Sequence, residues 1–210
     1  MGVKRPQPHD LVWGLCPADL PATAPAWAHA VVARGLPAVV RRAPGEDGRL
    51  PVGLRGEGRE QRLALHLPIT RVRRVRCPEA LVADLPEHAD AIPALRALAW
   101  VRPLLDALGL PWGVGGSAGY QLATGETCLH ASSDLDLILR TAQPFPRAAA
   151  AELFSQLDAA PTRIDLQLQT PNGGVGLGEW AGSAARVLVK ADHGAYLSAD
   201  PWASPCETVA

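Results

Sequence analysis

Ser133-Asp134-Leu135-Asp136-Leu137-Ile138-Leu139-Arg140 is the stretch that decides the fold of this 210-residue chain. Polar and apolar side chains alternate along most of it, which predicts a half-buried β-strand. Asp134 and Asp136 then project from one face of the strand, while the leucines pack on the other face. Two neighbouring carboxylates repel each other unless a cation lies between them, so the pair indicates a divalent-metal site. The alternative is a strand end in solvent, with Asp134 capping a turn.

Upstream of this strand, Gly115-Gly116-Ser117 follows a predicted strand over 112–114. It opens a predicted helix over 118–123 that Gly125 ends. Free backbone N–H groups and the positive end of a helix dipole at such a turn favour phosphate binding. An ordinary serine cap after a tight turn is the other interpretation.

Downstream, a helix is predicted over 148–157, with Pro146 at its first turn, and residues 162–169 then alternate strictly as a strand. Asp165 lies on the polar face of that strand, as does Arg163. If the two strands are neighbours, Asp165 joins the Asp134–Asp136 pair. Asn172-Gly173-Gly174 predicts a hairpin turn, which argues against a dinucleotide loop for the glycines that follow, because such a loop opens a long helix.

The first 80 residues form short apolar segments separated by turn signals, including an alternating strand over 62–67. We therefore predict a small, strand-rich domain over 1–80 and a catalytic domain over 87–210. The second domain begins with a helix after Pro93, which Pro103 is expected to kink or restart and Gly109 to close.

Charge is divided unequally between these halves. Residues 1–80 carry 13 Lys and Arg against 7 Asp and Glu, whereas residues 81–210 carry 7 against 14. A basic front half favours an acidic partner or a polyphosphate, although a solvated basic face would have the same composition.

Several classes of protein are excluded by composition. No run approaches the roughly 20 apolar residues of a membrane helix, and no apolar segment follows the basic N-terminus as in a secretory signal, so we expect a cytoplasmic protein. The four cysteines form no Cys-x-x-Cys pair, which argues against a zinc ribbon or a redox motif. The six histidines show no metal-ligand spacing. A structural role is expected for His9, beside Asp10, with a functional role as the alternative.

The Gly116-Ser117, Asp134-x-Asp136 and Asp165 pattern resembles the DNA polymerase β-like nucleotidyltransferase superfamily. More closely, the chain resembles the malonate decarboxylase holo-acyl carrier protein synthase family, the phosphoribosyl-dephospho-CoA transferases. The matching stretches span both halves of the chain and are residues 9–13, 39–42, 50–56, 111–117, 133–137, 163–165 and the segment ending at Glu179-Trp180.

This resemblance implies an α+β protein: a small strand-rich N-terminal domain and a polymerase β-like α/β domain with a mixed sheet. It also implies transfer of the 2′-(5″-phosphoribosyl)-3′-dephospho-CoA group from its triphosphate precursor to a serine of the acyl carrier subunit of malonate decarboxylase, with release of diphosphate. Neither a membrane nor a nucleic acid is expected as a partner.

Within that reaction the residues receive the following roles. The catalytic and metal-binding carboxylates are Asp134, Asp136 and Asp165, which hold two Mg²⁺ ions, with Mn²⁺ as an alternative. The phosphate-binding set is Gly115, Gly116, Ser117, Arg163 and Lys190. Arg186 is a further candidate to balance the charge of the phosphates, with a surface cation as the other interpretation. Other basic residues are available for the nucleotide or the carrier protein without being apportioned between them: Arg41, Arg42, Arg55, Arg59, Arg71, Arg73, Arg74 and Arg76.

Two alternatives stay open. A nucleotidyltransferase of the same fold could act on another hydroxyl, in a small molecule or in the citrate lyase carrier protein. A carrier-protein binding module without turnover is the alternative of a different class, and the three retained carboxylates argue against it.

Overall fold

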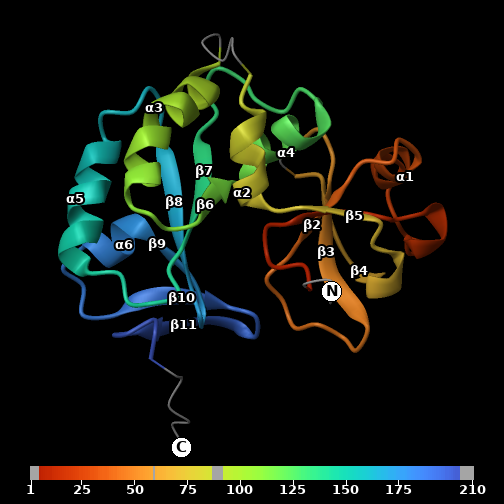
Figure 1. Ribbon diagram of the computed structural model, residues 1–210. Coiled ribbons are helices and arrows are strands. Elements are labelled where there is room, and N and C mark those ends of the chain that lie inside the picture. Colours follow the sequence, from red (N-terminus) through yellow and green to blue (C-terminus); the bar gives the residue numbers. More distant parts are fainter. Residues whose placement is uncertain (1–4, 59, 87–91, 204–210) are drawn as a thin grey trace, which may run out of the picture.

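The computed structural model describes residues 5–58, 60–86 and 92–203, and these residues form an α+β protein with two β-sheets. The first sheet is built from the front half of the chain and the second from the rest (Figure 1). No helix among the described residues has the length and apolar character needed to cross a membrane.

The N-terminal sheet is antiparallel and has the strand order β4-β3-β2-β1-β5. Its strands are β1 (Leu11–Trp13), β2 (Ala38–Val40), β3 (Arg49–Arg55), β4 (Arg62–Pro68) and β5 (Arg74–Arg76). Helix α1 (Ala26–Ala33) and the 3₁₀ turns η1 (Pro17–Asp19) and η2 (Ile69–Arg71) complete this half. The predicted strand over 62–67 is therefore confirmed as β4.

Side-chain alternation gives this small sheet two different faces. Val52 and Leu54 are fully buried in the N-terminal core, together with residues of α1. Gly53 and Arg55, at the intervening positions of β3, face the opposite way, toward the second sheet. At these two positions β3 thus presents arginine and glycine, rather than apolar side chains, to the cleft.

The C-terminal sheet is mixed and has the order β11-β10-β9-β8-β7-β6. Its strands are β6 (Trp112–Val114), β7 (Leu135–Arg140), β8 (Ile164–Thr170), β9 (Gly173–Gly176), β10 (Val187–Ala191) and β11 (Gly194–Ser198). Only β7 and β8 run parallel to each other. Helix α5 (Arg147–Leu157) connects them, as a parallel pair requires.

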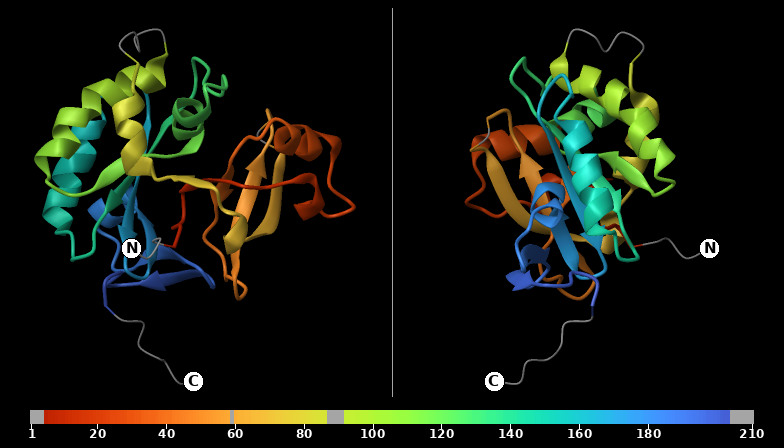
Figure 2. Two further views of the ribbon diagram at one scale, coloured as in Figure 1. Left: turned by 45° about the vertical axis from the view of Figure 1, so that its right-hand side comes forward. Right: turned by 90° about the vertical axis from the view of Figure 1, so that its left-hand side faces the viewer.

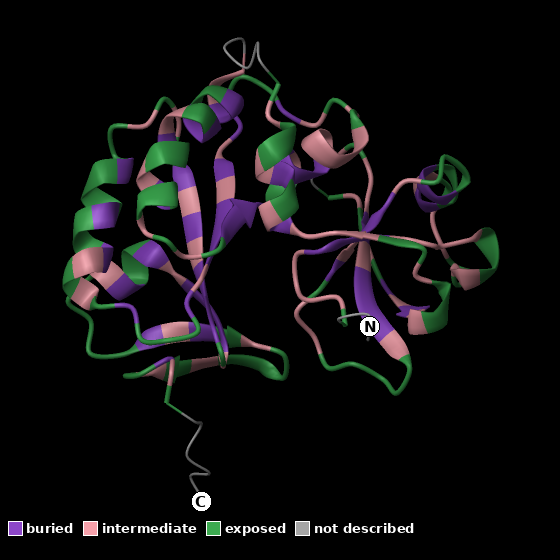
Figure 3. Ribbon diagram, in the orientation of Figure 1, coloured by how far each residue is buried: buried purple, intermediate pink, exposed green. Residues whose placement is uncertain are grey.

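Helices α3 (Pro93–Ala107), α5 and α6 (Leu177–Ala181) lie on one side of this sheet, and the side facing the N-terminal half stays open to the small sheet (Figures 1 and 2). Most residues of β7 and β8 are buried, and intermediate residues interrupt them only at two positions in each strand (Figure 3). The open face is the one that carries Asp136 and Asp165.

Helix α2 (Pro78–Leu81) and the 3₁₀ turn η3 (Val82–Asp84) connect the two halves. Gly113 of β6 lies so close to the backbone of α2 that a Cβ there would fall 2.1 Å from the carbonyl carbon of Pro78. Leu81 is buried in the C-terminal core, and so is Leu11 of β1. The halves therefore share core residues at this junction.

Four local expectations need correction. Helix α3 does not restart at Pro103 but continues through it, because both this proline and Ala99, whose carbonyl it leaves without an intrahelical partner, are exposed to water. Helix α4 (Gly116–Thr124) begins two residues before the predicted start, so Ser117 lies in its first turn and Gly115 is the cap. Strands β7 and β8 begin at Leu135 and Ile164, which leaves Asp134 and Arg163 just before them.

Candidate functional site

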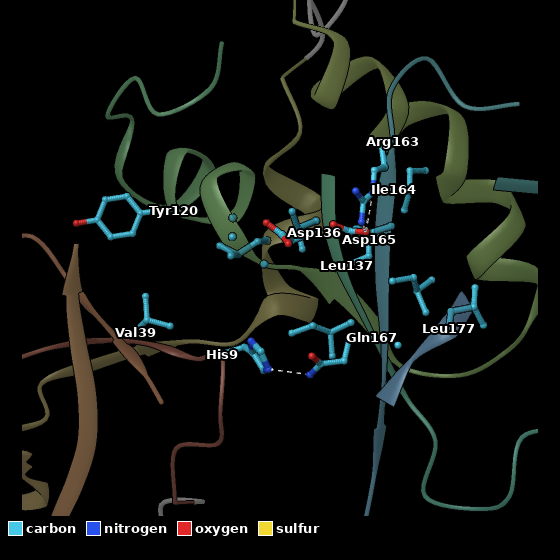
Figure 4. A pocket seen from close by; sticks show the side chains of 18 of the residues that line it. His9, Val39, Tyr120, Asp136, Leu137, Arg163, Ile164, Asp165, Gln167 and Leu177 are labelled. Carbon is cyan, nitrogen blue, oxygen red and sulfur yellow. Dashed lines mark hydrogen bonds and ion pairs between the residues drawn. The ribbon is translucent and has the colours of Figure 1, made fainter. Parts of the chain in front are cut away.

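A cleft of about 1310 Å³ lies between the two sheets. The open face of the C-terminal sheet forms one wall, with residues of β7, β8 and the start of α4 (Figure 4). Strands β3 and β4 of the N-terminal sheet form the opposite wall. Six of the eight predicted site residues line this cleft, namely Gly115, Gly116, Asp136, Arg163, Asp165 and Lys190, whereas Ser117 and Asp134 are not among the lining residues.

Asp136 and Asp165 are directly paired in register on the parallel strands β7 and β8, and both line the cleft. Adjacent positions on neighbouring strands place the two carboxylates on the same face (Figure 4). Burial raises the pKa of Asp136, and the negative charges of Asp134 and Asp165 raise it further. The three carboxylates thus act on one another electrostatically, although Asp134 is not among the cleft-lining residues.

Arg163 binds Asp165 directly. Its Nε and Nη2 atoms donate hydrogen bonds to Oδ1 of Asp165 at 3.0 and 2.7 Å. Both side chains are partly open to solvent, 76% for Arg163 and 42% for Asp165. Arg163 therefore lies at the mouth of the carboxylate site, where an incoming anion can reach it.

The donor chemistry at this point fits a hard divalent cation, because the groups are carboxylate oxygens with a raised proton affinity in one of them. Across the part of the chain that the structure describes, no group of three or more His, Cys, Asp or Glu side chains is gathered closely enough to hold an ion. The core of the site is therefore the Asp136–Asp165 pair, with Asp134 beside it rather than in a closed three-residue cage.

The start of α4 packs against the same aspartate. The backbone N–H of Gly115 donates to the carbonyl oxygen of Asp136 at 2.9 Å. Gly116 has φ +55°, and a Cβ at this position would fall 1.8 Å from Oδ2 of Asp136. Only glycine fits a backbone of this conformation and proximity. The predicted phosphate loop and the predicted metal carboxylates therefore meet.

Arg55 also lines the cleft, although its local sequence does not distinguish it from the other arginines of the front half. Its Nη2 atom donates to Ser117 Oγ at 2.7 Å, across the cleft from β3 to α4. The positive charge of Arg55 also acts on Asp136, where it lowers the pKa against the effect of burial. The only sequence signal was its position in a stretch that matches the related family.

The other candidate arginines differ in whether they line the cleft. Arg41 and Arg62 line the cleft together with Arg55. Outside it, Arg71 pairs with Asp19, Arg76 with Asp84, and the Arg74 guanidinium lies 4.6 Å from the ring centre of Trp13. Arg42 contacts Gln169 and Asp192, Arg186 donates to the carbonyl oxygen of Leu197, and Arg59 lies outside the described residues.

Lys190 lines the cleft but is not part of the carboxylate group. It lies on β10 and pairs with Gly174, two strands away from Asp165 and near the far end of β8. At a rise of about 3.3 Å per residue, the four positions between Asp165 and the level of Lys190 correspond to roughly 13 Å along the strand. Lys190 can therefore reach a different part of a long ligand, not the same phosphate.

His9 also lines the cleft, although a structural role is expected for it from the sequence. Its Nε2 atom lies 3.3 Å from the side-chain amide nitrogen of Gln167, two residues along β8 from Asp165 (Figure 4). Burial lowers the pKa of His9 to about 4, assisted by the charges of Arg42, Arg140 and Lys190. The imidazole is therefore neutral at neutral pH.

A mixed sheet, a glycine–serine helix start and carboxylates on adjacent parallel strands define an α/β fold of the nucleotidyltransferase type. Two family models match the chain: phosphoribosyl-dephospho-CoA transferase MdcG N-terminal domain over residues 7–78, and the C-terminal domain of the same family over residues 80–201. The chain belongs to the phosphoribosyl-dephospho-CoA transferase family, and it is a transferase enzyme.

Curated relatives with the name phosphoribosyl-dephospho-CoA transferase cover nearly the whole chain. A protein of Pseudomonas putida strain W619 is 57% identical, over 95% of this chain and 97% of its own length. A relative from Azotobacter vinelandii is 53% identical, and one from Pseudomonas aeruginosa is 51% identical, each over 94% of both chains. The comparison with solved structures gave no match.

Proposed function

We propose that this enzyme transfers the 2′-(5″-phosphoribosyl)-3′-dephospho-CoA group from its triphosphate precursor to a serine of the malonate decarboxylase acyl carrier protein, with release of diphosphate. The observation that carries the proposal is the contact of Gly116 with Asp136, which joins the phosphate-binding turn to the Asp136–Asp165 pair. Phosphoryl-group transfer needs these two elements within one ligand's length of each other.

In the proposed reaction the serine hydroxyl of the carrier attacks the α-phosphorus of the donor. The bond from that phosphorus to the oxygen bridging to the β-phosphate breaks, and diphosphate departs with the bonding electrons. Asp165, which faces the cleft, accepts the serine proton. The first turn of α4, with Gly116 and Ser117, binds the departing charge through its backbone N–H groups.

Mg²⁺, with Mn²⁺ as a substitute, would be held by Asp136 and Asp165 with Asp134 beside them, and would supply Lewis-acid stabilisation of the phosphate oxygens. Arg163 is exposed beside Asp165 and supports the binding of an anionic donor at the mouth of the site. Lys190 and His9, at the other end of the cleft, support binding of the part of the donor remote from the triphosphate.

The size of the cleft also supports a large donor. About 1310 Å³ exceeds the roughly 300–1,000 Å³ of ordinary small-molecule pockets. A donor that combines a triphosphate, two riboses, an adenine and a pantetheine arm would need such length. A much smaller donor would leave a large part of this volume to water.

The test is the intact mass of the apo carrier subunit after incubation with the enzyme, Mg²⁺ and triphosphoribosyl-dephospho-CoA. The expected result is a mass gain equal to the phosphoribosyl-dephospho-CoA group, lost when EDTA is added. No gain with folded enzyme would remove this acceptor. Parallel incubation with the citrate lyase carrier protein decides between the two carriers, and a carrier bound without any mass gain would indicate a binding module.

A further inference from the structure

Arg55 bridges the two halves of the molecule at the candidate site. It is the last residue of β3, and its guanidinium reaches Ser117 in the first turn of α4 at 2.7 Å. The same guanidinium lies 5.9 Å from the ring centre of Tyr120, one turn further along α4. Tyr120 lies between α4 and the N-terminal sheet (Figure 4), so this contact also spans the cleft.

The surroundings of Arg55 differ from those of the surface arginines on the same sheet. Arg49 pairs with Glu46 and Arg76 with Asp84. Among the described residues, Arg55 forms no ion pair with a carboxylate. A guanidinium has five N–H donors, and the hydrogen bond to Ser117 uses one of them. The remaining donors face a cleft that also contains the start of α4.

The charge of Arg55 acts at the same place as the proposed chemistry. It lowers the pKa of Asp136, which burial and two neighbouring carboxylates raise. The start of α4 brings these groups together. Gly116 packs against the side chain of Asp136, and Gly115 donates its N–H to the carbonyl oxygen of Asp136. Ser117, in the same helical turn, accepts the hydrogen bond from Arg55. A phosphate bound against Gly116 and Ser117 would therefore lie within reach of Arg55, because Ser117 Oγ already accepts its hydrogen bond.

We propose that Arg55 is a catalytic residue, supplied by the N-terminal sheet, whose guanidinium binds the diphosphate as it leaves. This inference rests on the proposed function. When the serine oxygen bonds to the α-phosphorus and the bond to the bridging oxygen breaks, negative charge grows on the diphosphate while the serine proton passes to Asp165. The planar fork of Arg55 then binds two of its oxygens, which a lysine cannot do.

The experiment compares Arg55→Ala, Arg55→Lys and Arg49→Ala in the full-length enzyme. Arg49 is the matched control, because it is on the same strand but outside the cleft. Arg55→Ala should lower kcat by about 10²- to 10³-fold, the usual effect of removing one donor to developing charge. Arg55→Lys should recover only part of this rate, and low concentrations of guanidinium should restore turnover to Arg55→Ala. Arg49→Ala should retain the parent rate.

A second measurement does not depend on the carrier protein. Titration calorimetry with inorganic diphosphate should show affinity at least tenfold weaker for Arg55→Ala than for the parent and for Arg49→Ala. Full turnover and unchanged diphosphate affinity in Arg55→Ala would overturn the proposal. The proposal would also be overturned if Arg55→Ala lost turnover together with a fall in its melting temperature and guanidinium did not restore that turnover. If the parent enzyme binds diphosphate but modifies no carrier, the proposed acceptor fails while the assignment of Arg55 is still decided by the titration.

Discussion

Gly116 and Asp136 are in such close contact that no other residue can replace the glycine without moving the aspartate: a Cβ would fall 1.8 Å from Oδ2. The contact fixes the distance between the turn that is proposed to bind phosphate and the carboxylate that is proposed to bind metal. It also explains why the helix starts at a glycine with φ +55° rather than at the serine.

Gly116→Ala should lower the transfer rate by about 10²-fold or more, because displacement of a reacting group by an ångström has an effect of that size. Gly125→Ala, at the other end of α4, is the control. Gly125 also has a positive φ, but nothing lies within 4 Å of its added Cβ. It should lose about 1 kcal/mol of stability and keep its activity. Equal rates for the two variants would contradict the proposed role of the Gly116–Asp136 contact.

Asp136→Asn and Asp165→Asn should each weaken Mn²⁺ binding at least tenfold and remove nearly all Mg²⁺-dependent transfer. The physical reason is that an amide oxygen carries no net charge to neutralise a divalent cation. Mn²⁺ binding can be followed by electron paramagnetic resonance of the free ion. Asp158→Asn is a suitable control, since Asp158 lines the same cleft at the end of α5. Full Mg²⁺-dependent transfer by Asp136→Asn would rule out the metal assignment.

The stability of the protein should fall with acidification between about pH 6.5 and pH 4 because of His9. Its pKa is lowered from 6.5 to about 4 in the folded state, so within this window the unfolded chain binds the extra proton. His9→Asn should reduce the pH dependence of unfolding in that range, by on the order of 1 to 3 kcal/mol. Asparagine also tolerates the φ of 78° at this position.

Urea unfolding at several pH values would measure this effect of His9. His29→Asn provides the comparison, because His29 is exposed on α1. An unchanged slope in His9→Asn would show that the imidazole is not the group responsible.

Arg140→Met should destabilise the fold by on the order of 2 kcal/mol, since it removes this cation from the buried carboxylate of Asp10 and the half-buried carboxylate of Glu79. Arg140, the last residue of β7, pairs with Glu79 of α2 and lies 4.0 Å from Asp10 before β1. Arg102→Ala removes an exposed ion pair with Asp106 on α3 and should cost no more than about 0.5 kcal/mol. Thermal unfolding of the two variants measures the difference in stability. Similar losses of stability would show that the Arg140 ion pairs contribute no more than an exposed pair.

Local patterns were sufficient for most elements of the catalytic half. Alternation predicted β7 and β8, and glycines marked the ends of α3 and α4. The pairing of Asp136 with Asp165 could not be predicted from local patterns, because it depends on which strands are neighbours and in what register. The periodicity of side chains within one strand indicates neither its neighbour nor its register. The expectation that Asp165 joins the Asp134–Asp136 pair therefore rested on the family resemblance.

Arg55 and His9 show the other limit. Arg55 is one of 13 basic residues in the first 80, and nothing in its local sequence distinguishes it from those at the surface. Its importance arises from a contact with Ser117, 62 positions away in the chain. His9 likewise acquires its neutral state from burial in the cleft wall, assisted by the charges of Arg42, Arg140 and Lys190, and these conditions arise only in the folded protein.

Gly113, which allows the backbone of α2 to rest directly on β6, has a consequence for the way this enzyme can evolve. The segment that leaves the N-terminal sheet is fitted to the catalytic sheet with no room for a methyl group between them. The two halves are therefore poor candidates for independent exchange between relatives. A functional chimera should be joined before Pro78, so that α2 stays with the sheet on which it packs. A junction after Leu85 would move α2 with the front half and would require glycine at the position of Gly113 in its new neighbour.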